Sequence, residues 1–293
     1  MPDDLPIPTV LSIHDSSTLR WRELRRCAVG LGDRVRCQGF QRYARRYERL
    51  VYPRFDRCVV VAKTDRDELL RVAPGARIEV IPNGTDTHYF RPSSVERKRN
   101  ALVFHGSLSY PPNVQGAAEF VEWIFPVVRR EVPSATFRLV GAAPSPFVRT
   151  LVSKSGVALL ADLPDLREAL STSHVYVCAI RHGGGVKNKI LEALALRLPV
   201  VCYPEAVAGI ECIPGTHLLV AENRDEFARH VVTLLRDPGL CAQLGDAGRR
   251  LMEQAYSWTA RASAYDRLYA EVQQERRARD TPIVTSPGEE LAR

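Results

Sequence analysis

The sequence predicts an α/β protein built on parallel sheets, and three observations lead to this prediction. Nine short runs of apolar, often β-branched residues recur along the 293-residue chain, and helical patterns separate them. The runs are continuously apolar and do not alternate with polar residues, which is typical of strands buried on both faces of a parallel sheet. Regular alternation of such strands with helices favours a doubly wound α/β fold.

The predicted strands and helices follow one another along most of the chain. The strands cover 9–13, 58–61, 78–81, 101–105, 136–140, 157–160, 175–179, 200–203 and 218–220. The helical patterns cover 113–131, 146–154, 164–171, 186–197, 224–235, 238–253 and 258–277, the last of them behind a capping Ser257.

A turn at Pro82-Asn83-Gly84 and a polar stretch up to residue 100 divide these elements into two groups. We therefore expect a partial N-terminal domain over 1–92, which holds only three of the strands, and a complete α/β domain over 93–256. A single helix over 257–275 follows. The polar, proline-containing residues 276–293 are expected to form a disordered tail.

Composition narrows the compartment in which the protein works. The 45% apolar content excludes wholesale disorder, and no apolar run approaches the roughly 20 residues of a membrane-spanning helix. Seven cysteines are present, an odd number, and none shows the spacing of a metal site. Several of them lie inside apolar runs, where a free thiol behaves as a small apolar group. A reducing cytoplasm is therefore the expected compartment. We also expect the protein to have no metal site.

The net charge of +7 is concentrated near the N-terminus, where arginines and aromatic residues gather in the basic segment 20–57. The densest part, 40–49, is compatible with nucleic-acid binding through stacking. It also suits a basic amphipathic helix on an anionic membrane, or a helix that is merely solvated. No nucleic-acid-binding module is recognisable, so we expect no nucleic-acid partner and a peripheral contact with anionic lipid, with the solvated helix as the alternative.

The segment 182–194 carries the clearest chemical signal. It follows a predicted strand and opens a predicted helix, with three consecutive glycines at 183–185 and then Lys187 and Lys189. Glycines let the backbone approach a ligand closely, and a helix start offers free N–H donors and a partial positive charge. Lysines there oppose the helix dipole, which suggests a bound anion. The pattern favours a phosphate site over a tight turn with solvated lysines.

Glu192 is the only charge among residues 190–196. Its carboxylate would suit the hydroxyl groups of a sugar, and the alternative is an exposed helix position. The dinucleotide-binding pattern that starts at Gly183 would need a glycine where Asn188 stands, and the P-loop pattern is absent. A dinucleotide-dependent oxidoreductase and a P-loop NTPase are therefore disfavoured.

Several segments, in the right order, resemble the retaining family-4 glycosyltransferases of the GT-B fold. The segments are PTVLSIHD at 8–15, VIPNGTD at 80–86, HGSL at 105–108, KILEALALRLPVV at 189–201 and YSW at 256–258. The resemblance covers the chain to about residue 272. It implies two Rossmann-like parallel-sheet domains and a nucleotide-sugar as donor substrate. It also implies transfer to a glycan or lipid-linked acceptor without a metal or other cofactor, in polysaccharide or cell-envelope glycan biosynthesis.

The resemblance also implies roles for individual residues. His14, Lys187 and Lys189 would be catalytic, and Glu192 would bind the ribose of the donor. The nucleobase would lie on the backbone of Ala161, Asp162 and Leu163. The donor diphosphate would lie on Gly106, Ser107, Arg181, Gly183, Gly184, Gly185, Val186, Lys187 and Lys189.

The chain departs from the family pattern in two places. Gly184 stands where the family has the first glutamate of its Glu-x7-Glu pair, and Ser107 and approximately Asn113 stand where an arginine and a lysine clamp the diphosphate. Lys187, Lys189 and Arg181 would supply that charge instead. In addition, the family's first domain begins with about four more strand–helix units, so we expect an incomplete N-terminal domain. The alternative function is a catalytically inactive remnant or a partner subunit of the same fold.

Overall fold

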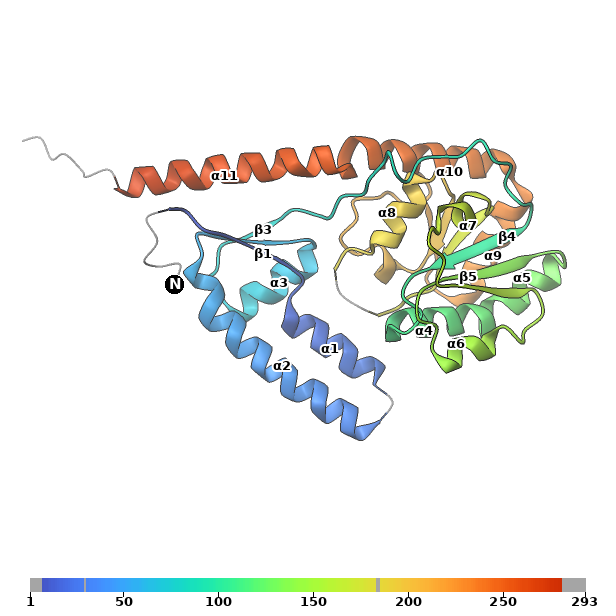
Figure 1. Cartoon of the computed structure of the whole chain (residues 1–293), viewed down its shortest axis with the longest axis horizontal. Coiled ribbons are helices and arrows are strands. Elements are labelled where there is room, and N and C mark those ends of the chain that lie inside the picture. The colour runs from blue at the N-terminus through green and yellow to red at the C-terminus, as the bar shows by residue number, and fades with distance from the viewer. Residues whose placement is uncertain (1–6, 29, 183–184, 281–293) are drawn as a thin grey trace, which may run out of the picture.

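The computed structural model describes residues 7–28, 30–182 and 185–280, and it contains two separate parallel sheets (Figure 1). All nine predicted strands are present, each within one residue of its expected ends. The predicted α/β class is therefore confirmed. A connection without helix or strand runs from residue 81 to residue 100 and joins the two sheets.

The N-terminal sheet has three strands in the order β1-β2-β3, all parallel. The strands are β1 (Val10–His14), β2 (Arg57–Val60) and β3 (Ile78–Val80), and the helices are α1 (Ser17–Cys27), α2 (Leu31–Val51) and α3 (Lys63–Val72). Cys58 and Val60 of β2 pack on Leu69 of α3 in a small apolar core. Helices α1 and α2 form a hairpin that extends away from both sheets in Figure 1.

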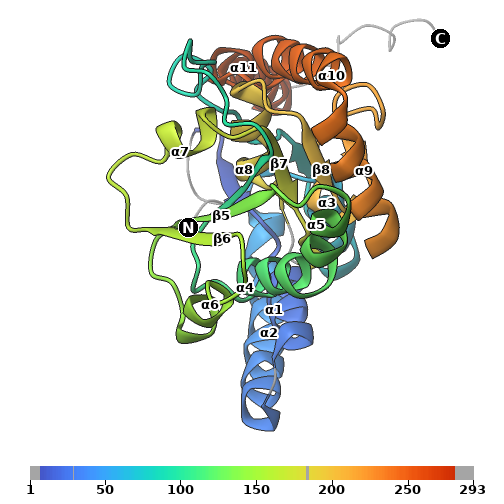
Figure 2. The same cartoon turned by 90° about the vertical axis from the view of Figure 1, so that its right-hand side faces the viewer.

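The C-terminal sheet has six parallel strands in the order β6-β5-β4-β7-β8-β9. The strands are β4 (Ala101–His105), β5 (Thr136–Gly141), β6 (Val157–Ala161), β7 (Val175–Cys178), β8 (Val200–Cys202) and β9 (Leu219–Val220). The helices are α4 (Pro111–Glu119), α5 (Phe125–Glu131), α6 (Pro146–Leu151), α7 (Arg167–Ser171), α8 (Asn188–Ala195), α9 (Arg224–Arg236) and α10 (Pro238–Leu251). Helices lie on both sides of this sheet, as Figure 2 shows.

The single helix predicted over 113–131 is divided in the structure. Helix α4 ends at Glu119, a π-helical turn covers Phe120–Ile124, and α5 follows. The cause is Pro126, which has no amide hydrogen to donate to the carbonyl four residues earlier. The N–H of Phe125 instead bonds to the carbonyl of Phe120, five residues back. The wider turn places both phenylalanines in the core.

A continuous apolar core holds the C-terminal sheet and its helices together. The ring of Phe120 lies 4.6 Å from that of Phe137 on β5 and 5.9 Å from that of Phe227 on α9, measured between centroids. Helix α8 contributes Ile190, Leu191 and three further fully buried residues. Because so much of α8 is packed, its first turn is held rigidly relative to the ends of the strands.

Helix α11 (Trp258–Asp280) runs back along the N-terminal domain (Figure 1). Its Leu268 and Val272 are buried against Val59 and Ile81 of the N-terminal sheet region. The expected end at residue 275 is wrong, because the helix continues to Asp280. Ion pairs from Glu275 to Arg57 and Arg77, and from Arg276 and Arg279 to Asp56, anchor these last turns. Residues 281–293 lie outside the described part of the chain.

Across 7–28, 30–182 and 185–280, every helix is too short or too polar to cross a membrane.

Candidate functional site

The candidate site lies where the connections of the C-terminal sheet change direction. From β4 the chain moves outward to β5 and β6, and then returns to place β7 on the other side of β4. In open α/β sheets, ligands bind outside the carboxyl ends of the strands at this switch point. Here the turn after β4 and the start of α8 meet there.

Lys189 is the cation at this point. It is the second residue of α8, and its Nζ lies 4.7 Å from the centroid of the Phe104 ring. The ammonium group donates to Oδ1 of Asn113, and Nδ2 of Asn113 donates to the carbonyl of Ser107 at 2.8 Å. Because an ammonium group can only donate, the Asn113 atom that faces Lys189 must be the amide oxygen. Asn113 therefore ties the lysine to the turn after β4.

Two glycines allow this close arrangement. Gly106 has a φ of +151°, and a Cβ placed there would lie 2.7 Å from Nζ of Lys189. Gly141 has a φ of +154°, and a Cβ there would lie 1.8 Å from the carbonyl oxygen of Gly106. A side chain at either position would separate the turn after β4 from its neighbours.

Both lysines of the segment sit where their positive charge is disfavoured. Burial lowers the pKa of Lys189 to about 8, and burial also lowers the pKa of Lys187. Lys187 is the N-cap residue of α8 in an extended conformation, one position before the helical turn in which the sequence placed it. Two partly desolvated cations beside the positive end of a helix favour the binding of an anion such as a diphosphate.

Glu192 faces the same site and is not a solvated surface residue. Its side chain is 23% exposed, and its Oε2 lies 2.6 Å from Nε2 of His105, the last residue of β4. The His105 side chain is only 4% exposed. The sequence did not predict this partner, because the two residues are 87 positions apart and lie in two separate segments.

The described end of the glycine segment contacts the N-terminal domain. The backbone N–H of Gly185 donates to the carboxylate of Asp65, which also accepts from the N–H of Ser16 at 2.8 Å. Asp65 is fully buried at the start of α3, and burial raises its pKa to about 6. Asp15 lies against Gly185 as well. Gly183 and Gly184 lie outside the described residues, whereas Val186 is half-buried beside this contact.

His14 stands at the carboxyl end of β1, immediately before Asp15. It is exposed and has a φ of +66°, and the sheet register shifts between Ser12 and His14. The N–H of Val61 donates to the His14 carbonyl at 3.0 Å and fixes this strained conformation. Strained backbone of this kind concentrates at functional sites.

Arg181 belongs to a different group from Lys189. Its guanidinium lies 3.5 Å from the centroid of the Tyr203 ring, and it donates to the carbonyl of Glu222 at 3.4 Å. It lines a cavity of about 360 Å³ between the two domains, together with Glu23 and Arg26 of α1. Gly185 lines the same cavity, while the guanidinium of Arg181 is engaged by Tyr203, and a contact of Arg181 with the diphosphate stays a prediction. Its position in sequence did not reveal the direction of its side chain.

The three residues expected to hold a nucleobase follow β6. Ala161 ends the strand, and Asp162 has a φ of +53° while its Oδ1 accepts from the N–H of Ala143 at 2.9 Å. Leu163 is 41% exposed. The turns after β5 and β6 are thus tied together, and an apolar side chain is left open beside them.

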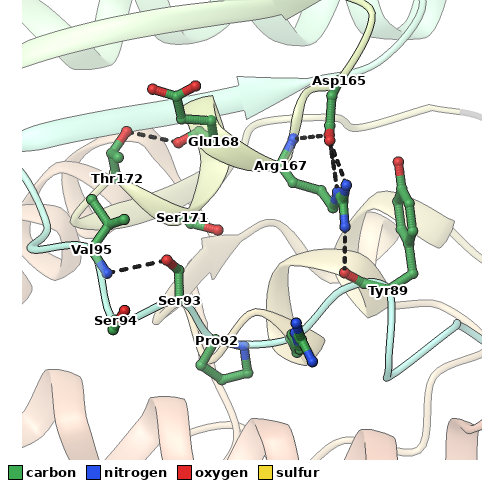
Figure 3. A pocket seen from close by; sticks show the side chains of 11 residues that line it. Tyr89, Pro92, Ser93, Ser94, Val95, Asp165, Arg167, Glu168, Ser171 and Thr172 are labelled. Atoms are coloured by element: carbon green, nitrogen blue, oxygen red, sulfur yellow. Dashed lines mark hydrogen bonds and ion pairs between the residues drawn. The ribbon is translucent and has the colours of Figure 1, made fainter.

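A second hollow, which the sequence did not predict, lies between the interdomain connection and α7 (Figure 3). Its volume is about 630 Å³. The guanidinium of Arg167 lies 3.9 Å from the centroid of the Tyr89 ring and pairs with Asp165 at 2.6 Å. None of the predicted site residues lines it. Within the residues that the structure describes, no cluster of three or more His, Cys, Asp or Glu is arranged to hold a metal ion.

Two protein-family models match the chain in succession. The model described as Glycosyltransferase Family 4 matches residues 3–89, and the model described as Glycosyl transferases group 1 matches residues 99–237. Alpha-maltose-1-phosphate synthase of Mycolicibacterium smegmatis is 27% identical over 308 residues, covering 91% of this chain and 73% of that protein. GDP-mannose-dependent alpha-(1-6)-phosphatidylinositol monomannoside mannosyltransferase of Mycobacterium tuberculosis is 27% identical over 213 residues, covering 65% of this chain and 55% of that protein.

Solved structures agree with these matches at the level of the fold. Sucrose-phosphate synthase from Thermosynechococcus elongatus has a TM-score of 0.74 at 16% identity, over 93% of this chain and 69% of that one. Anabaena Alr3699/HepE, solved with UDP and glucose, has a TM-score of 0.67 at 16% identity, over 89% and 71%. The chain therefore has the GT-B fold, and the two family models identify it as a glycosyltransferase, one matching its N-terminal part and the other its larger C-terminal part.

Proposed function

We propose that this chain transfers a sugar from a nucleoside-diphosphate donor to a glycan or lipid-linked acceptor. It does so with retention of the anomeric configuration and without a metal ion, in the assembly of a polysaccharide or cell-envelope glycan. The observation that carries the proposal is the meeting of Gly106, Lys189 and Glu192 at the switch point of the C-terminal sheet. The relatives support the donor class, since one is named for GDP-mannose and one structure holds UDP.

The charges of the site fit the breaking of the bond between the sugar and the diphosphate. As this bond breaks, negative charge grows on the leaving diphosphate. Lys189, Lys187 and the first N–H groups of α8 would stabilise that charge from fixed positions, which is usually the largest catalytic contribution. Glu192 would bind the ribose, and the exposed surface at Leu163 would lie under the base. His14 would face the donor sugar from the N-terminal domain.

The same proposal places the protein on the cytoplasmic face of an anionic membrane. All seven cysteines are unpaired, which supports a reducing compartment. On α2, helical spacing puts the exposed Val35, Tyr43 and Leu50 opposite the side that packs on α1, and Arg42 and Arg46 lie on the same exposed side. Apolar and basic residues on one helix face match the chemistry of an anionic bilayer surface.

Sedimentation with vesicles tests the membrane contact. Vesicles that contain phosphatidylserine should carry down the protein, and vesicles of phosphatidylcholine alone should not. The double variant Arg42→Gln, Arg46→Gln should lose most of this binding, because each basic residue near an anionic surface is worth about 1 kcal/mol. Equal, weak sedimentation with both vesicle types would show instead that α2 is a solvated helix.

Thermal unfolding with UDP and GDP tests the donor site. A nucleotide present at 100 times its Kd stabilises by about 2.7 kcal/mol, which corresponds to a rise in Tm of about 5 °C. Lys189→Met and Glu192→Gln should abolish the rise, whereas Lys154→Met, which removes an exposed lysine, should preserve it. A chain whose Tm responds to neither nucleotide would contradict the proposal.

Turnover separates the two functional alternatives. An enzyme releases free nucleoside diphosphate from a nucleotide-sugar faster when an acceptor is present. The nucleotide could bind while no lipid-linked or glycan acceptor speeds the formation of free nucleoside diphosphate from the nucleotide-sugar. The chain would then be a non-catalytic subunit of the same fold.

A further inference from the structure

His105 is a further residue of this site, where it contacts Glu192. Neither the family resemblance nor the sequence pattern gives this residue a role. It ends β4, the central strand, which is buried along its whole length and pairs with both β5 and β7. Its backbone is therefore among the most firmly held in the C-terminal domain.

The imidazole ring is held as firmly as the backbone. Its edge meets the ring of Tyr176 on β7, with centroids 5.4 Å apart and planes at 70°. Nε2 reaches Oε2 of Glu192 at 2.6 Å. The other ring nitrogen, Nδ1, is buried without a hydrogen-bond partner in the described part of the chain. The carboxylate is thus the one polar contact that orients the ring.

The hydrogen-bond pattern assigns the ring hydrogen to Nε2. A hydrogen on Nδ1 would be buried without an acceptor, which costs more than leaving the lone pair there. Nε2–H then donates to the carboxylate and fixes one oxygen of Glu192. The described residues offer Oε1 no hydrogen bond, so that oxygen is free to accept from a ligand.

We propose that His105 is a positioning residue that makes the site select ribonucleotides. It holds the Glu192 carboxylate so that its unoccupied lone pairs accept from the two neighbouring hydroxyls of the ribose. If the carboxylate were free to rotate, the site would still bind the diphosphate through Lys189. It would discriminate less between ribose and a sugar without these hydroxyls. The inference rests on the proposed nucleotide donor, and it deepens that proposal by naming the residue that holds Glu192 in place for the ribose.

The test compares the affinity for UDP and GDP with the affinity for their 2′,3′-dideoxy analogues, measured by calorimetry on the whole chain. Hydrogen bonds to a charged group predict that the wild-type protein prefers the ribose form by about tenfold or more. His105→Gln and His105→Met are a matched pair of equal length, and only glutamine keeps a donor. His105→Gln should hold the ratio within about twofold, whereas His105→Met should lower it several-fold and leave the affinity for the dideoxy form unchanged.

Each outcome decides the inference. If His105→Met keeps the wild-type ratio, or weakens both forms equally, His105 is a packing residue and the inference is wrong. If the wild-type protein binds neither UDP nor GDP, the proposed function fails first, and the inference fails with it. If a His105 variant does not fold, the inference is tested on the wild-type chain instead. The Nε2–H signal of His105 in ¹⁵N-labelled protein should move on adding UDP or GDP and stay in place with the dideoxy forms, and the same movement with both would overturn the inference.

Discussion

The lowered pKa of Lys189 predicts how nucleotide affinity depends on pH. Burial sets this pKa at about 8 in the free protein. A bound diphosphate favours the charged lysine and returns its pKa toward the ordinary value of about 10.4. Below pH 8 the lysine carries its proton in both states, so the affinity should be flat. Above pH 8 the protein must take up a proton in order to bind, and the affinity should fall as pH rises.

The size of the effect follows from the linkage of one proton. Each pH unit above 8 costs about 1.36 kcal/mol of binding free energy, or a factor of about ten. Because half of the lysine has already lost its proton at pH 8, the Kd for UDP or GDP should rise about 15-fold between pH 8 and 9.5, equal to about 1.6 kcal/mol. The second ionisation of a phosphate group, near pH 6, is complete over this range and adds no slope of its own.

Calorimetric titration of the wild-type protein at pH 7, 8, 8.75 and 9.5 measures this slope. Lys189→Met should bind weakly with little pH dependence, and the exposed-lysine control Lys154→Met should behave as the wild type. A Kd that stays constant from pH 8 to 9.5 in the wild-type protein, or a steep slope that persists in Lys189→Met, would refute the reasoning.

Three further substitutions test other parts of the structure. Gly141→Ala, which drives a Cβ into the carbonyl of Gly106, should lower the free energy of unfolding by more than about 1 kcal/mol in urea titrations and weaken nucleotide binding. Asn113→Leu removes the acceptor that holds Lys189 and should raise the Kd for UDP or GDP about tenfold, as calorimetry would show. Leu268→Ala in α11 should cost about 2–5 kcal/mol of stability in urea and leave the Kd for the nucleotide unchanged.

The strands were predictable because a strand buried on both faces needs a continuous run of apolar residues, which is visible in the sequence. Every apolar run in the sequence became a strand, since a parallel sheet covered by helices allows few polar residues. Helix boundaries were less predictable. The π-helical turn before Phe125 depends on Pro126. The periodic pattern of apolar residues continues through this proline and therefore does not indicate the turn. The extra turns of α11 depend on ion pairs between Glu275 and arginines about 200 residues earlier.

The candidate site could be predicted only in part, because some of its residues lie in short, recognisable segments and others depend on contacts between distant parts of the chain. Gly106, Lys189 and Glu192 belong to short segments with recognisable chemistry, and the structure brings these segments together. The contacts of His105 and Asn113 with those residues span 87 and 76 positions, so no local pattern reports them. The direction of the Arg181 side chain was not predictable, because it is set by Tyr203, which follows a different strand.

A crystal structure of the chain with UDP or GDP bound would test the central claim most directly. The account predicts a diphosphate between the Gly106–Ser107 turn and the first turn of α8, within hydrogen-bond reach of Lys189, with the ribose hydroxyls on Glu192. A nucleotide seated instead in the hollow beside Tyr89 and Arg167, with the space before α8 occupied only by water, would contradict it.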